Sequence, residues 1–203
     1  MKRTLLVAAM AIATSLVLSA PVAHANSISF VANLTGALEV PSSGSPGTGN
    51  ATVVLDLTAQ TMQVNVIFSG LEAGTTASHI HCCLSSPFLT GVSVGVATTV
   101  PYFPGFPLGV TSGSYISPLF DLTNPSSYNP AFVTLEGGTA GAEAALLLGI
   151  ESGETYLNIH TTAFPGGEIR GFLTPVPEPG SILLVALGLV GLICTRRKLG
   201  RNN

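Results

Sequence analysis

The sequence predicts an all-β domain, an antiparallel β-sandwich or barrel with one short helix, flanked by a signal peptide and a C-terminal apolar helix. Short segments of alternating apolar and polar residues, rich in β-branched side chains, recur along the middle of the chain. Gly, Pro, Ser and Thr fill the gaps between them. Many short strands with mostly short connections are typical of antiparallel sheets that fold over themselves. A separate apolar segment stands near each end of the chain.

The expected strands follow one another at short intervals. They cover Ser27–Leu34, Ala51–Leu57, Met62–Phe68, Ala77–Cys82, Val92–Val96, Ser114–Leu122, Thr155–His160 and Glu168–Thr174. The four residues from Thr58 to Thr61 are expected to form a hairpin loop, and the Pro-containing aromatic segment from Pro101 to Val110 a surface loop. Only Thr139–Ile150, rich in Ala and Leu, has a helical pattern, and Thr139 is its candidate N-cap.

The first 25 residues have the order of segments found in a secretory signal peptide. Two basic residues precede an apolar run from Leu5 to Leu18, and the small-residue signature Ala23-His24-Ala25 follows. Cleavage is expected after Ala25. The alternative, a membrane-spanning helix, needs about 20 apolar residues, which is more than this run supplies.

The end of the chain predicts a membrane-associated tail. Residues 175–180 form a Pro-rich linker, residues 181–195 an apolar membrane helix and residues 196–203 a basic tail. The basic cluster Arg196-Arg197-Lys198 is expected to stay in the cytoplasm, which leaves residues 26–174 outside. The apolar stretch is short for a lasting span.

This tail resembles a known sorting signal. Val176-Pro177-Glu178-Pro179, then an apolar helix, then Arg-Arg-Lys, is similar to the PEP-CTERM signal of Gram-negative bacteria. The resemblance implies that an exosortase recognises the chain and cuts near Pro177, Glu178 and Pro179. It also implies export through the inner membrane, transient anchoring, release to the cell surface or medium, and a link to exopolysaccharide and biofilm.

The charge of the central part excludes one class of partner. Residues 26–174 contain nine of the ten acidic residues and only one of the seven basic residues, Arg170, which gives a net charge of about −8. A domain without a basic face is not expected to bind nucleic acid or anionic lipid. Arg170 is expected to pair with Glu168 or Glu39.

Five segments of residues 26–174 form a recognisable pattern: Gly36 to Pro41, Phe68 to Leu71, His79-Ile80-His81, Tyr156 to Thr161 and Phe164 to Gly171. With these segments, residues 26–174 resemble the CHRD domain, a family first described in chordin. The resemblance implies an extracellular β-rich domain that is not an enzyme. The sequence departs from the commoner family pattern at Cys82-Cys83.

Three histidines of the central part form the candidate metal site: His79, His81 and His160. Residues two apart on a strand point to the same face, so His79 and His81 point together, and Asn158 and His160 do likewise on the later strand. Neutral imidazole binds copper or zinc, so either ion suits a site of three histidines. The alternative is that they are structural hydrogen-bonding residues at a sheet edge.

Cys82 and Cys83 are a candidate disulfide or thiol site. Adjacent Cα atoms lie about 3.8 Å apart across a trans peptide, below the usual range for a disulfide. The sequence therefore leaves four states open: a vicinal disulfide, free thiols, a bridge to another chain and a metal-bound thiolate. Cys194 lies in the tail and is not expected to pair with them.

The predicted function is that of an exported, non-catalytic protein of the cell envelope or extracellular matrix. A metal-binding or redox module that uses the histidine cluster is the alternative, and a hydrolase is the third hypothesis. Serine is abundant, but no G-x-S-x-G nucleophile motif precedes a helix.

Overall fold

The computed structural model describes residues 27–177 and Gly188. The expected signal peptide (1–25), most of the expected membrane helix (181–195) and the basic tail (196–203) lie outside these residues, as do Glu178 and Pro179 of the sorting motif. Within the described part of the chain, no helix has both the length and the apolar character needed to cross a bilayer.

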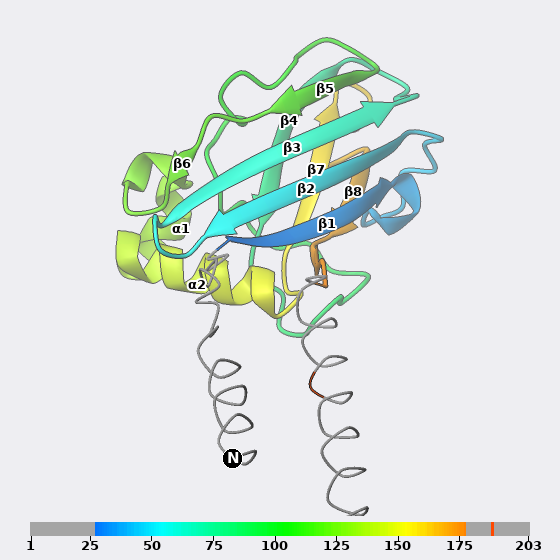
Figure 1. Ribbon diagram of the computed structural model, residues 1–203. Coiled ribbons are helices and arrows are strands. Elements are labelled where there is room, and N and C mark those ends of the chain that lie inside the picture. The colour runs from blue at the N-terminus through cyan, green and yellow to red at the C-terminus, as the bar shows by residue number, and fades with distance from the viewer. Residues whose placement is uncertain (1–26, 178–187, 189–203) are drawn as a thin grey trace, which may run out of the picture.

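One antiparallel sheet of nine strands builds the domain (Figure 1). Its main order is β4-β7-β8-β1-β2-β3-β5, while β6 pairs with β3 and β9 pairs with β1. The sheet curls, so that β4, β7 and β8 cross behind β1, β2 and β3 (Figure 1). The strands are β1 (Ser27–Thr35), β2 (Thr48–Asp56), β3 (Thr61–Ser69), β4 (Thr75–His81), β5 (Gly113–Ile116), β6 (Phe120–Asp121), β7 (Tyr156–Thr161), β8 (Ile169–Phe172) and β9 (Thr174–Pro175).

Alternation decides which face of β1, β2 and β3 is buried. Every second residue points into the curl, and these residues form much of the core: Phe30, Ala32, Leu34, Ala51, Val53, Leu55, Met62, Val64, Val66 and Phe68. The β2–β3 hairpin turns at residues 57–60, where the Asp56 carboxylate accepts hydrogen bonds from the backbone N–H groups of Thr58 and Ala59. The expected hairpin is confirmed, but its turn lies one residue earlier than predicted, since Thr61 is the first residue of β3.

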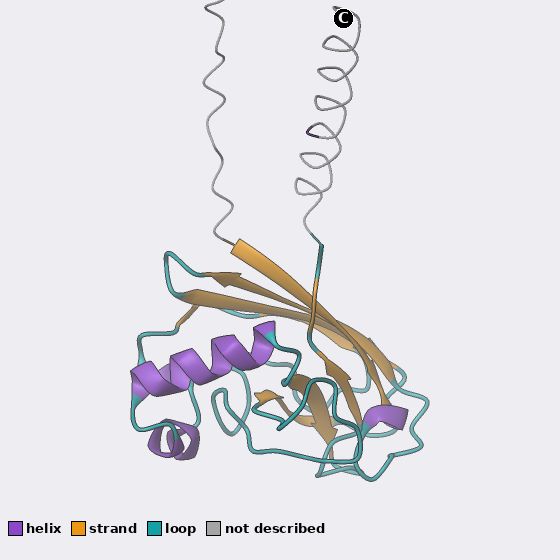
Figure 2. Ribbon diagram, turned by 90° about the horizontal axis from the view of Figure 1, so that it is seen from below, coloured by secondary structure: helices purple, strands orange, loops and turns teal. Residues whose placement is uncertain are grey.

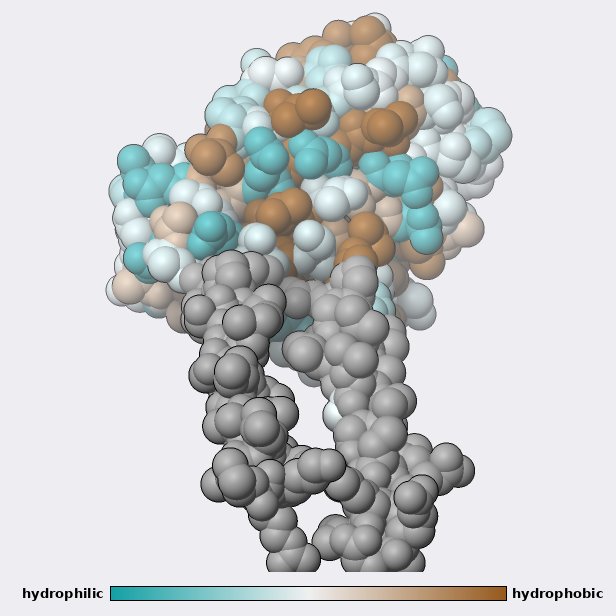
Figure 3. All heavy atoms as spheres, viewed as in Figure 1, coloured by the Kyte–Doolittle hydropathy of each residue, from teal (hydrophilic) through white to brown (hydrophobic). Residues whose placement is uncertain are grey.

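The outer face of the same strands is open to solvent. Asn50 and Thr52 of β2 point outward beside two exposed isoleucines, Ile67 of β3 and Ile116 of β5. In Figure 3 this face shows hydrophobic groups scattered among hydrophilic ones. One buried face and one solvated face are the ordinary arrangement of an antiparallel sheet.

Helices close the open side of the curl (Figure 2). The helix α2 (Thr139–Glu151) confirms the expected helix, and it buries Ala142, Leu146 and Ile150 against the sheet. Its N-cap is Gly138 without a side-chain hydrogen bond, so Thr139 is the first helical residue and not the cap. A second helix, α1 (Pro130–Leu135), was not expected from the sequence; Asn129 caps it and Pro130 begins it. Two 3₁₀ turns, η1 (Gly36–Leu38) and η2 (Pro125–Ser127), complete the helical segments.

Two expected strands differ from the structure. Residues 92–96 run beside β4 but form only one bridge, between His81 and Val96. The ladder fails there because the Thr98 hydroxyl accepts the hydrogen bond of the Ile80 N–H, at 2.9 Å. The expected strand Ser114–Leu122 is split into β5 and β6, since Pro118 between them has no N–H to donate.

The expected surface loop from Pro101 to Val110 is only partly at the surface. Phe103 and Phe106 are buried in the hydrophobic core, where Phe106 packs on Phe68 and Phe103 on Tyr115. The loop is therefore held in place by its aromatic residues.

Strands β4 and β7 are buried on both faces. Ile80, Leu157 and Ile159 point into the hydrophobic core. The opposite face carries His79, His81 and Asn158, and these are also buried, because residues 92–101 cross over them. Polar side chains in a buried layer need hydrogen-bond partners, and this layer holds the candidate site.

Candidate metal centre

The structure brings His79, His81 and His160 together. β4 pairs with β7 in antiparallel register, with His79 opposite Asn158 and Ala77 opposite His160. One ring nitrogen of each histidine lies within 4.8 Å of the other two. Among the histidine, cysteine and acidic side chains of the described residues, these three histidines form the group that could hold a metal ion. His79 and His81 are buried, and His160 is half-buried.

A backbone carbonyl group fixes each ring. His79 Nε2 lies 2.7 Å from the Pro101 oxygen, His81 Nδ1 lies 2.7 Å from the Val94 oxygen, and His160 Nδ1 lies 2.9 Å from the Pro165 oxygen. A carbonyl oxygen can only accept, so the facing ring nitrogen must carry the proton. These contacts assign the tautomer of every ring.

The three rings are neutral near pH 7. Burial lowers the pKa of His79 and of His81 to about 4 each, although the hydrogen bonds to Pro101 and Val94 oppose the shift. Burial also lowers the pKa of His160. A neutral imidazole has one proton, and that proton is already bonded to a carbonyl oxygen. His79 Nδ1, His81 Nε2 and His160 Nε2 therefore present unprotonated lone pairs.

The spacing of two of these nitrogens suits one metal ion. His79 Nδ1 and His160 Nε2 are 3.3 Å apart. Two nitrogens bound to a tetrahedral ion at about 2.05 Å are themselves about 3.3 Å apart. Because neither nitrogen carries a proton in the assigned tautomers, no hydrogen bond joins them. A cation between them would be attracted by both lone pairs.

Each of the three histidines has the support that metal-binding histidines have in other proteins. One ring nitrogen donates to a carbonyl oxygen, which fixes the orientation of the ring and raises the basicity of the other nitrogen. His81 also stacks on Tyr156, with the ring centroids 4.7 Å apart.

Asn158 and Glu39 complete the polar layer, and neither was predicted as a site residue. Asn158 Oδ1 lies 3.1 Å from His81 Nε2. Burial raises the pKa of Glu39 to about 7, while the charge of Arg170 and hydrogen bonds from Val40 and Asn158 act to lower it. The alternation that predicts the direction of His160 also places Asn158 on the same face. Glu39 was expected only as a partner of Arg170, and no local pattern predicts that it lies beside the histidines.

The positive charge of Arg170 acts to lower the pKa of Glu39, which is one of the two partners expected from the sequence. Arg170 is fully buried, donates to the backbone oxygens of Leu38 and Val92, and lies over the Tyr156 ring at 4.5 Å. Glu168, the other expected partner, accepts hydrogen bonds from Ser45, Thr161 and the Glu72 N–H. Glu168 therefore connects, through these hydrogen bonds, the loops that contain Ser45 and Glu72 with strand β7.

Comparison with known families identifies the domain. The profile of the CHRD domain matches residues 30–173. The chain belongs to the CHRD domain family. The PEP-CTERM protein-sorting motif matches residues 175–198, directly after it. Both resemblances seen in the sequence are confirmed, and the chain is an exported protein of the kind that an exosortase sorts. Searches of curated proteins and of solved structures gave no match.

In the CHRD domain, Cys82 and Cys83 are joined by a disulfide. Their peptide bond is cis, and their Cα atoms lie 3.0 Å apart. Both sulfurs contact the oxygen of Ala145 in α2, and a side chain at Gly149 would meet them. The disulfide packs on α2, and neither cysteine belongs to the histidine group.

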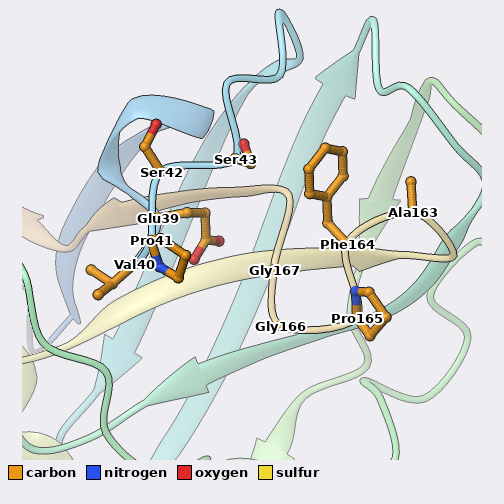
Figure 4. Close-up of a pocket in the computed structure, with 10 residues that line it drawn as sticks. All are labelled: Glu39, Val40, Pro41, Ser42, Ser43, Ala163, Phe164, Pro165, Gly166 and Gly167. Atoms are coloured by element: carbon orange, nitrogen blue, oxygen red, sulfur yellow. The ribbon is translucent and has the colours of Figure 1, made fainter.

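A small cavity adjoins the three histidines of the CHRD domain. Its volume is about 300 Å³, and it lies between residues 39–43 and residues 163–167 (Figure 4). Glu39 contributes one wall and Pro165, whose oxygen accepts from His160, contributes the other. The two segments that line the cavity therefore also contribute groups that contact the polar layer around the histidines.

Proposed function

We propose that the CHRD domain of this exported protein is a non-catalytic metal-binding domain that acts at the cell surface or in the extracellular polymer. The observation that carries the proposal is the convergence of three histidines, each with its one proton bonded to a carbonyl oxygen. A purely structural role for these rings would leave three lone pairs facing one another without a proton.

Copper or zinc suits this set of ligands. Imidazole nitrogen is a ligand of both ions, and copper has the higher intrinsic affinity for such a site. Thiolate ligands are excluded while Cys82 and Cys83 remain in their disulfide. A redox role for the two cysteines is a separate hypothesis, which follows from their position next to His81.

Calorimetric titration of the exported protein, without its signal peptide, tests the proposal. Copper(II) or zinc should bind with a stoichiometry of one to the wild type and not to the variant with His79, His81 and His160 changed to Ala. Glu151→Gln, which removes an exposed charge at the end of α2 and outside the histidine group, is the control for weak binding by the acidic surface. Equal binding by the wild type and the triple variant would leave only the structural role.

The location at the cell surface or in the polymer is proposed from the sorting motif. Neither matched family is a family of enzymes, which supports a non-catalytic role and disfavours the hydrolase hypothesis. In a host with an exosortase, mass spectrometry of the released protein should find no residues after roughly Pro179. Intact Asn203 on the extracellular protein would contradict cleavage. Recovery with the polysaccharide fraction of a biofilm, and its loss when the polymer is digested, would test the link to exopolysaccharide.

A further inference from the structure

Asn158 occupies the centre of the buried polar face. It lies opposite His79 on β4 and opposite Arg170 on β8, and it is 1% exposed. Its backbone oxygen accepts a hydrogen bond from the Ser78 hydroxyl on the core side. Its side chain lies on the other side, among the histidines.

The contact between Asn158 and His81 joins two acceptors. His81 Nδ1 carries the proton of the ring, because it faces the Val94 oxygen. His81 Nε2 is therefore a lone pair, and the atom 3.1 Å from it is Asn158 Oδ1, an amide oxygen. Two acceptors at this distance repel each other unless a cation lies beside both.

Glu39 explains why the amide oxygen faces the histidine. The nitrogen of the Asn158 amide lies on the side of the Glu39 carboxyl group, because a Cβ atom at position 167 would meet Glu39 Oε1 at 2.4 Å and Asn158 Nδ2 at 2.8 Å. The amide N–H₂ group is the only donor of an asparagine side chain, so bonding to Glu39 turns Oδ1 toward His81. Arg170 lies opposite Asn158 on β8, and its positive charge attracts the same carboxyl group.

Gly167 leaves the space for this contact. A Cβ atom at position 167 would lie 2.4 Å from Glu39 Oε1 and 2.8 Å from Asn158 Nδ2. The backbone there has a φ of +128°, which L side chains rarely adopt. The Gly-Gly turn before β8 thus makes room for the Glu39–Asn158 pair, and Arg170, in β8 itself, supplies the charge.

We propose that Asn158 Oδ1 is a fourth ligand of the metal centre and that Glu39 is the positioning residue that orients its amide. The proposal rests on the metal-binding function proposed above. The 3.1 Å between Asn158 Oδ1 and His81 Nε2 is close to the ligand spacing of about 3.3 Å in a tetrahedral site. A set of three nitrogens and one oxygen favours a divalent ion, copper(II) or zinc, over copper(I), which prefers softer ligands.

Copper(II) electron paramagnetic resonance of the exported protein tests the proposal. Asn158→Ala should change the g and hyperfine values, because water replaces the amide oxygen, and should weaken zinc binding by about 10- to 100-fold. Asn158→Asp keeps an oxygen of the same reach, so it should retain the ion with a spectrum shifted by the added charge. Glu39→Gln should weaken binding less than Asn158→Ala, since its amide can present either an acceptor or a donor to Asn158.

Ser78→Ala is the matched control. It removes a buried hydrogen bond to the Asn158 backbone without touching the side chain, so its spectrum should equal that of the wild type. If the wild type binds copper(II) and both Asn158 variants give the wild-type spectrum, the fourth ligand is refuted while the metal site stands. If the wild type binds neither copper(II) nor zinc, the metal function itself is refuted.

Discussion

Acidification gives a quantitative test of how deeply the proposed metal site is buried. A change from about pH 7.5 to about pH 5.5 should weaken zinc binding by less than about tenfold. Protons compete with the metal for the same lone pairs, so the size of the loss depends on the pKa of each histidine in the metal-free protein.

The magnitude follows from the lowered pKa values. A histidine with the ordinary pKa of about 6.5 costs about tenfold in affinity over this interval, so three such residues would cost about a thousandfold. Burial lowers the pKa of His79 and of His81 to about 4 each, so at about pH 5.5 only a few per cent of either ring is protonated. Burial also lowers the pKa of His160, so its contribution stays below the tenfold of an ordinary histidine.

The same shifts fix the sign of the effect on stability. The folded pKa lies below the unfolded one, so between about pH 6.5 and about pH 4 the unfolded chain binds protons that the folded chain does not. The metal-free domain should therefore lose stability as the pH falls through this window. Protons should compete with the metal for His79 and His81 only as the pH falls toward about 4.

Zinc titration calorimetry in buffers that do not bind zinc measures the affinity at each pH. A short peptide with the His-Ile-His sequence is the control, and it should lose affinity steeply because its rings are solvated. A fall of about a thousandfold for the protein would refute the reasoning, since it would mean that the rings titrate as in water.

Three further predictions concern the packing around the site, and denaturant unfolding measures each of them. Gly149→Ala should destabilise the domain by about 1–3 kcal/mol, because its Cβ would lie 2.6 Å from the Cys82 sulfur. The cost should be smaller when Cys82 and Cys83 are also changed to Ala, and an equal cost in both backgrounds would contradict the contact. Glu168→Gln should cost about 1–3 kcal/mol, since three donors converge on this buried carboxylate, and a cost near zero would show that they do not. Arg170→Lys should cost more than about 2 kcal/mol, because Lys loses the planar contact with Tyr156, and wild-type stability would refute that role.

The sequence by itself determined the elements whose residues alternate or repeat regularly. The alternation in β1, β2 and β3 states which residues face the core, because side chains on a strand point to opposite faces with a period of two. The Ala- and Leu-rich segment of α2 was equally clear. The same period placed His79 with His81, and Asn158 with His160, before any partner strand was known.

Tertiary structure decided what lies opposite and above those residues. Alternation gives the direction of a side chain but not what covers it. It could not show that residues 92–101 bury His79 and His81 and supply the carbonyl oxygens that fix the tautomers of these two rings. The pairing of β4 with β7 joins segments about 80 residues apart, and no local pattern encodes such a partner. Glu39 and Asn158 form one network only because the chain returns to the same place, with Gly167 leaving the room between them. The chemistry of the site therefore depends on long-range packing, while the choice of its three histidines was already present in the sequence.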